Sequence, residues 1–257
     1  MLVAALSVLV FAAPARAGTD FITADPCVAT FIGVRGTGEA AGSGTMHNGR
    51  VYQVGGLGTR LVPLTLGFSS DPDIPVFMEQ LVYPASAFPA WGTSNQLYTN
   101  SVNTGATNLA AEIEYIASIC PHTNILLAGY SQGAQVIGNV LAGSPALSAA
   151  ARARVTAVTL FADPSYNFGE KWDYNYQLLG QGVFHRTPGA FSSWTRQGWL
   201  PGDTAPSQQT IVRSYCLAND MWCQGNAGGA DVHANGYTSA VVSPGWTFMR
   251  NWMIDYE

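Results

Sequence analysis

A serine lies at the join between two apolar segments, where the local backbone could make it a nucleophile. Gly129, Ser131 and Gly133 form a G-x-S-x-G pattern. The short apolar run 124–129 before it predicts a buried strand, and residues 134–141 after it have helical spacing. A serine on so sharp a strand-to-helix turn projects its hydroxyl from the strand end. The pattern therefore predicts a nucleophile elbow, against the plainer alternative of a serine that only caps a helix.

A nucleophilic serine needs a base to take its proton and an acid to orient that base. In α/β hydrolases these residues follow in the chain order serine, acid, histidine. Of the four histidines, His47 and His122 precede Ser131, and His185 lies in a segment with no readable period. His233 lies in a Gly- and Asn-rich loop ahead of the final predicted helix, which leaves it free to reach the strand ends. It is the candidate base.

Two aspartates compete for the role of the acid. Asp220 lies between Cys216 and Cys223, where a disulfide would hold its carboxylate in a small loop near the imidazole. Asp163 lies at the end of a predicted strand, 155–162, although Asp-Pro is also a common turn opener. The residues by themselves favour Asp220 and leave Asp163 open.

A glycine-rich loop follows the first predicted strand, 27–36, which alternates apolar residues. The loop begins with the stretch RGTGE, residues 35–39. Hydrolases of this class place the second amide of their oxyanion hole in such a loop. Thr37 is the candidate donor, and an ordinary glycine turn is the alternative reading.

The start of the chain has the features of an export signal. Residues 1–13 are almost continuously apolar, and a small-residue site ends at Ala17. The run is too short to span a bilayer and predicts a signal peptide cleaved after Ala17, so we expect a secreted protein. No later segment is apolar enough for long enough to anchor the chain in a membrane.

Four cysteines in an exported chain favour two disulfides over a metal site. Three pairings are possible in principle. Cys216 and Cys223 bracket a short loop, which favours their pairing and leaves Cys27 with Cys120. We expect neither a metal nor a cofactor.

Composition limits the class of partner. Charged residues make up 11% of the 257, hydrophobic residues make up 47%, and the formal net charge is -5. The chain thus lacks the basic surface that nucleic acid requires. Nothing resembles a linker or repeat, and we expect one catalytic domain over residues 18–257.

The order of predicted elements favours an α/β fold. Strand-like 76–83 and an amphipathic helix over 101–120 precede the serine segment, and strand 155–162 follows it. This order implies a mainly parallel central sheet with helices on both faces. Residues 53–67 are interpreted as a loop. Residues 167–209 have no sustained period, so the region 165–215 is interpreted as an insertion that forms either a flap over the site or a surface elaboration.

Several of these stretches together resemble the cutinases and the bacterial cutinase-like esterases. They are residues 27–39, the stretch CPHTNILLAGYSQG over 120–133, the CLANDMWC box over 216–223, and the histidine that follows it. The resemblance implies a three-layer α/β-hydrolase-type fold. It makes Ser131 the nucleophile, His233 the base and Asp220 the acid, and leaves Asp163 a structural role. It also implies oxyanion donors at the amides of Thr37 and Gln132, and the disulfides Cys27–Cys120 and Cys216–Cys223.

The activity implied is that of a monomeric serine carboxylesterase for short to medium acyl esters, extending to lipids and cutin-like polyesters. Two departures from the family pattern concern the surroundings of the site. The segment between Asp163 and Cys216 is longer than compact members need, and Thr37 and Gly38 replace Ser and Thr of fungal relatives. An esterase for cell-envelope lipids would use the same residues. A catalytically inactive surface-binding protein on the same fold is the alternative from another functional class.

Overall fold

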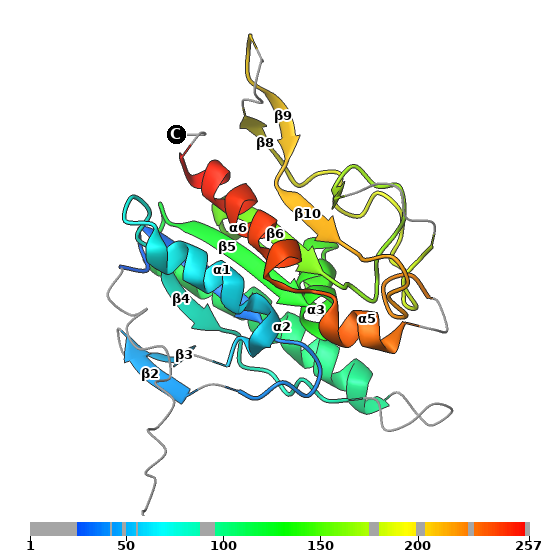
Figure 1. Ribbon diagram of the computed structural model, residues 1–257. Coiled ribbons are helices and arrows are strands. Elements are labelled where there is room, and N and C mark those ends of the chain that lie inside the picture. Colours follow the sequence, from blue (N-terminus) through cyan, green and yellow to red (C-terminus); the bar gives the residue numbers. More distant parts are fainter. Residues whose placement is uncertain are drawn as a thin grey trace, which may run out of the picture.

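A central β-sheet lies between two layers of helices (Figure 1). The computed structural model describes residues 25–41, 43–47, 50–54, 56–87, 96–174, 180–198, 204–225 and 229–254. The predicted signal peptide, 1–17, lies outside the described residues.

The sheet is mainly parallel. Its strands are β1 (Ala29–Val34), β2 (Ser43–His47), β3 (Arg50–Val54), β4 (Phe77–Gln80), β5 (Asn124–Tyr130), β6 (Val155–Phe161), β7 (Asp173–Tyr174) and β10 (Val212–Tyr215). Within the described residues their order is β2-β3-β4-β1-β5-β6-β10-β7. All pairings from β4 to β7 are parallel, whereas β3 pairs antiparallel with both β2 and β4. Strands β1 and β6 are buried along their whole length, as expected for strands covered on both faces.

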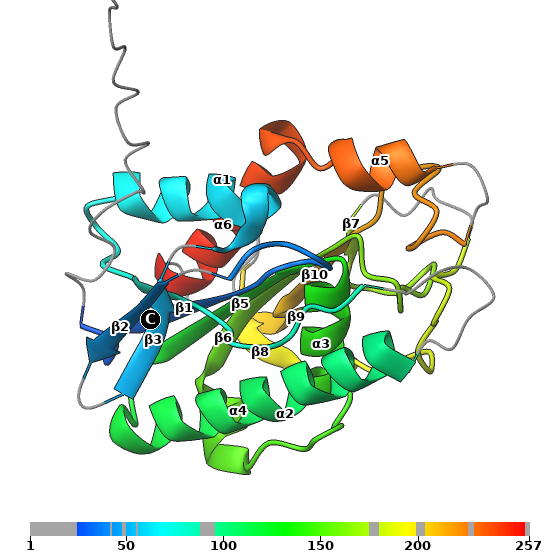
Figure 2. The same cartoon turned by 90° about the horizontal axis from the view of Figure 1, so that it is seen from below.

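Helices cover both faces of this sheet, as Figure 2 shows. Helices α1 (Gly58–Ser70) and α6 (Ser239–Ile254) lie on one face, and α2 (Gln96–Ile119), α3 (Gln132–Leu141) and α4 (Ala149–Arg154) on the other. The short helix α5 (Ala230–Asn235) lies beyond the carboxyl ends of the strands. The predicted α/β fold is therefore confirmed. No helix in the described ranges is long and apolar enough to cross a bilayer.

The loop predicted over 53–67 is wrong at both ends, because residues 53–54 belong to β3 and α1 begins at Gly58. Leu61, Leu64 and Phe68 are buried at helical spacing, whereas Gly58 and Gly67 resemble turn residues in the sequence. Gly67 has a packing role instead: a Cβ there would lie 2.6 Å from the Trp246 ring of α6. The close approach of α1 and α6 thus favours glycine at position 67. The same glycine made this helical segment resemble a loop in the sequence.

The region 165–215 contributes to the sheet as well as to the surface. It contains β7 and β10 of the sheet, and the separate antiparallel pair β8 (Thr195–Gly198) and β9 (Ser207–Thr210). Figure 1 shows this pair projecting away from the sheet. Strand β10 is four residues long with the polar sequence VRSY, too short for a periodic signal.

Candidate active site

Ser131 occupies a sharp turn between β5 and α3. Its backbone angles, φ 54° and ψ −120°, lie in a region that residues other than glycine rarely adopt. A Cβ on Gly133 would lie 2.0 Å from the Val34 carbonyl oxygen, so this position admits only glycine. A Cβ on Gly129 would lie 2.6 Å from the backbone of the following helix. The predicted strand-turn-helix geometry is present.

The structure brings Ser131, His233 and Asp220 together from three separate segments. The Nε2 atom of His233 lies 2.8 Å from Ser131 Oγ. The Nδ1 atom of the same ring lies 2.9 Å from both carboxylate oxygens of Asp220. His233 lies in α5 rather than in the loop that the sequence predicted. The imidazole is thus placed to take a proton from the serine while a carboxylate orients its other nitrogen.

Asp220 is completely buried, and its hydrogen bonds explain how a charge is tolerated there. It accepts from the main-chain amides of Trp222 at 2.8 Å and Cys223 at 3.3 Å. The hydroxyl of Tyr237 donates to its Oδ2 at 2.8 Å. Burial raises the pKa of Tyr237 well above its usual value, so the phenol keeps the proton that it donates. The carboxylate is therefore held in one orientation toward His233.

Both favoured disulfides, Cys216–Cys223 and Cys27–Cys120, are present. The first closes the loop that contains Asp220, and its Cys223 sulfur lies 3.4 Å from the Tyr237 hydroxyl. The second connects the chain just before β1 to the residue after α2. One disulfide thus lies beside the acid and the other lies outside the site.

We expect the two disulfides to differ in what their loss affects. In the double variant Cys216→Ser with Cys223→Ser, we expect the loss of kcat to be the main defect and the fall in melting temperature to be the smaller one, because the loop around Asp220 is loosened. Cys27→Ser with Cys120→Ser should do the reverse, since in the chain-entropy model the long loop contributes about 4 to 5 kcal/mol and the short one about 2 to 3. Melting temperature and kcat of both double variants test this. Full turnover in a folded Cys216/Cys223 double variant would contradict a positioning role for that bond.

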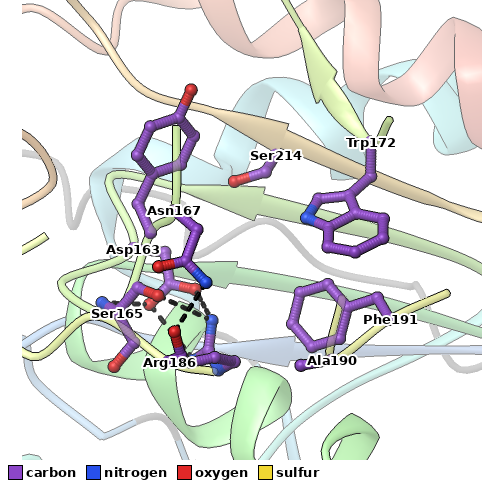
Figure 3. Close-up of a pocket in the computed structure, with 9 residues that line it drawn as sticks. Asp163, Ser165, Asn167, Trp172, Arg186, Ala190, Phe191 and Ser214 are labelled. Carbon is purple, nitrogen blue, oxygen red and sulfur yellow. Dashed lines mark hydrogen bonds and ion pairs between the residues drawn. The ribbon is translucent and has the colours of Figure 1, made fainter. Parts of the chain in front are cut away.

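Asp163, the rival acid, is engaged elsewhere. Its carboxylate forms an ion pair with Arg186 at 2.6 Å and accepts from the Ser165 amide at 2.8 Å. Figure 3 shows Arg186 reaching Asp163, with the Asn167 amide donating to the Arg186 carbonyl at 2.6 Å. The pair joins the end of β6 to the segment after residue 180. These contacts give Asp163 a structural explanation.

The residues predicted to form the oxyanion hole are linked through a side chain. The side-chain nitrogen of Gln132, Nε2, donates to Thr37 Oγ1 at 3.3 Å and to the Ser86 carbonyl at 2.9 Å. Its oxygen accepts from the Ser101 hydroxyl at 2.8 Å. Gln132 is fully buried. Its side chain therefore braces the RGTGE loop against α3, a role that the sequence did not indicate.

Hydrogen bonds of two charged side chains, Arg35 and Glu39, also hold the RGTGE loop in place. Arg35 is buried and donates to the carbonyls of Glu39 at 2.7 Å and Tyr83 at 2.6 Å. The Glu39 carboxylate accepts from the amides of Gly36 at 2.7 Å and Thr59 at 3.2 Å. Burial raises the pKa of Glu39, and these two amide hydrogen bonds counteract that rise. The loop is thereby tied to the N-terminal end of α1.

A cavity of about 380 Å³ opens beside Ser131. Its described lining residues are Thr37, Ala87, Tyr98, Tyr130, Ser131, Pro164, Trp222, His233 and Ala234. Part of the 165–215 region runs along one wall, because Phe184 donates its amide to the Pro164 carbonyl at 2.8 Å and Val183 donates to the Trp222 carbonyl at 3.0 Å. Apart from Ser131 and His233, the lining is aromatic or small, which suits an apolar substituent.

The other three histidines lie outside this cluster of Ser131, His233 and Asp220. His122 and His185 are exposed, and His47 belongs to β2, at the far edge of the sheet. Within the described ranges, no group of three or more His, Cys, Asp or Glu side chains is placed to bind a metal ion. Tyr130 and Tyr237, which contact His233 and Asp220, were not predicted from the sequence. Tyr130 could have been suspected from its place inside G-x-S-x-G, whereas Tyr237 has no distinguishing local pattern.

Comparisons with known proteins agree on one family. The model of the family described as Cutinase matches residues 27–252. Acetylxylan esterase 2 of Talaromyces purpureogenus is 29% identical over 189 residues, covering 66% of this chain and 74% of that protein. Carboxylesterase Culp1 of Mycobacterium tuberculosis is 28% identical over 242 residues, covering 92% and 87%. Other fungal relatives are matched over about half their length, 48% for a Hypocrea jecorina cutinase.

A solved structure extends the likeness to the fold. The catalytic core domain of acetyl xylan esterase from Trichoderma reesei superimposes with a TM-score of 0.61 at 26% identity. The match covers 88% of this chain and 98% of that one.

Proposed function

The chain belongs to the cutinase family, whose matched members are named as carboxylic ester hydrolases, and from this premise we propose that it is a secreted serine carboxylesterase. The proposed substrates are esters of short to medium acyl chains, extending to lipids and cutin-like polyesters. One observation supports this most directly: His233 lies within hydrogen-bonding distance of both Ser131 and Asp220.

In the proposed reaction Ser131 is the nucleophile. His233 Nε2 takes the hydroxyl proton as Oγ attacks the ester carbonyl, and Asp220 stabilises the imidazolium that forms. The 2.8 Å distance between Nε2 and Oγ permits this transfer without rearrangement. The buried, hydrogen-bonded carboxylate keeps Nδ1 protonated, so that Nε2 is the free acceptor.

The negative charge on the carbonyl oxygen needs donors that are already in place. We assign the main-chain amides of Thr37 and Gln132 to this role, supported by the Gln132 side-chain bridge between their segments. Collapse of the tetrahedral intermediate transfers the imidazolium proton to the leaving alcohol and leaves an acyl group on Ser131. Water, deprotonated by His233, then releases the acid and restores the serine.

The cavity supports the acyl preference. Its volume of about 380 Å³ lies near the lower end of the range for small-molecule sites, about 300 to 1,000 Å³. Tyr98, Pro164 and Trp222 contribute apolar surface to its lining. An esterase for cell-envelope lipids or for acetylated polysaccharides, the latter suggested by the names of two relatives, would use the same reacting groups and differ only in what the cavity admits.

Hydrolysis of p-nitrophenyl esters across acyl lengths tests the proposal. We expect kcat/KM to be greatest between the acetyl and octanoyl esters and to fall for palmitoyl, with a fluorophosphonate probe labelling Ser131. Polyester, envelope lipid and acetylated xylan assayed next would separate the substrate classes. Absence of both labelling and turnover in correctly folded protein would favour the inactive surface-binding alternative.

A further inference from the structure

Helix α5 contains His233 but has little hydrophobic packing to hold it in place. None of its six residues is buried, and no side chain caps its N-terminal end. A helix this short is not stable by itself in water. The orientation of His233 therefore depends on the specific contacts that α5 makes with the rest of the protein.

Two side chains from distant parts of the chain hold the C-terminal end of α5. The Tyr130 hydroxyl donates to the main-chain carbonyl of His233. Arg60 donates to the main-chain carbonyl of Ala234 and, at 3.2 Å, to Oδ1 of Asn235. Carbonyls in the last turn of a helix have no partner within it, and a cation at that end also interacts favourably with the helix dipole. These contacts satisfy the two carbonyls at and directly after the base.

Tyr130 connects the base to the nucleophile. It is the last residue of β5 and immediately precedes Ser131. Its ring stacks on the His233 imidazole, with centroids 5.4 Å apart and an interplanar angle of 27°. A Cβ on Gly36 would lie 2.7 Å from the Tyr130 ring, so the RGTGE loop packs directly against this ring. Tyr130 is therefore firmly placed when it contacts His233.

The main chain at Arg60 is also held in place by hydrogen bonds of its neighbours. It lies in the first turn of α1, and the adjacent Thr59 amide donates to the Glu39 carboxylate at 3.2 Å. The same carboxylate accepts the Gly36 amide at 2.7 Å. The Arg60 guanidinium also lies beside the Tyr130 hydroxyl. One hydrogen-bonded frame thus joins the loop of the proposed oxyanion hole, α1 and the segment of the base.

We propose that Arg60 and the Tyr130 hydroxyl are positioning residues, which hold the main chain around His233 so that its Nε2 stays within reach of Ser131. This inference rests on the proposed esterase function of the site. Arg60 is not among the described residues that line the cavity. Its removal therefore acts on the base and not on the binding of the substrate.

Arg60→Met is the first test, with Arg250→Met as its matched control. Arg250 is a partly exposed arginine that joins α6 to the other end of α1, through Asp71 at 2.5 Å. We expect Arg60→Met to lower kcat by about 10- to 100-fold, because small displacements of a reacting group have effects of this size. KM should change by less than about twofold, and Arg60→Lys should recover part of kcat. Equal kcat losses in both methionine variants, or a loss confined to KM, would overturn the proposal.

Coupling to the base is the second test. In a His233→Ala background, Arg60→Met should leave the residual turnover unchanged, because the group that it positions is gone. A further loss as large as in the parent would refute a role through His233.

The ring ¹⁵N resonances of His233 provide a readout that needs no substrate. Arg60→Met and Tyr130→Phe should shift or broaden them, and Arg250→Met should not. Unchanged resonances in both variants would overturn the positioning role. If the parent protein hydrolysed no ester, the proposed function would fail, and this measurement would still decide whether Arg60 holds the imidazole.

Discussion

Ser131→Ala is expected to abolish ester hydrolysis, lowering kcat by several orders of magnitude while leaving the protein folded. The variant removes the atom that would form the acyl-enzyme, so neither His233 nor the oxyanion donors have a covalent step to assist. Alanine adds no atoms, and the unusual backbone of residue 131 is already adopted by a residue with a Cβ. Residual catalysis of about 10³ to 10⁴ over water could persist from the remaining groups.

Turnover of p-nitrophenyl butyrate and the melting temperature would be measured on the same preparation. Ser69→Ala is a suitable control, because its hydroxyl donates to the Thr65 carbonyl at 2.6 Å within α1, away from the site. The control should keep parental kcat. Near-parental turnover in folded Ser131→Ala would show that the elbow is not the reacting centre.

Asp220→Asn should have the second largest effect, a loss of about 10⁴ in kcat on the precedent of serine proteases. An amide can keep the Tyr237 hydrogen bond, but its NH₂ group facing His233 would favour the tautomer with the proton on Nε2. That proton occupies the position from which the imidazole must accept from Ser131. The loss should therefore appear chiefly in kcat, together with a lower melting temperature, because an NH₂ group in place of Oδ1 cannot accept from the Trp222 and Cys223 amides.

Asp163→Asn is the matched comparison, since it makes the same chemical change in the rival acid. It weakens a buried ion pair with Arg186, and breaking such pairs typically destabilises a protein by about 3 to 5 kcal/mol. We expect a lower melting temperature with kcat close to that of the parent. A large loss of turnover in folded Asp163→Asn, with Asp220→Asn active, would transfer the acid role to Asp163.

Local sequence patterns predicted most of the fold because they reflect the backbone within one element. The apolar runs of β1, β5 and β6 are buried in the structure, and strands and helices alternate as expected for a parallel sheet. The prediction failed where a local signal conflicted with a packing demand. In α1, Gly67 resembles a turn residue but lies against Trp246. In β10, four residues are too few to show a period.

In the candidate site, too, the features shaped by local contacts were predictable and those that depend on long-range contacts were not. The elbow around Ser131 and the short loop around Asp220 could be predicted from local sequence. The bonds that shape them join residues close together in the chain, such as the Trp222 amide and the Asp220 carboxylate.

Which side chains meet across the site depends on contacts between residues far apart in the chain. The bond between His233 and Ser131 spans 102 residues and the bond between Arg60 and Ala234 spans 174. Whether such groups meet depends on strand order, helix packing and the path of intervening loops, which no window of neighbouring residues encodes. For the same reason local sequence favoured Asp220 but left Asp163 open, and the ion pair between Asp163 and Arg186 became visible only in the folded chain.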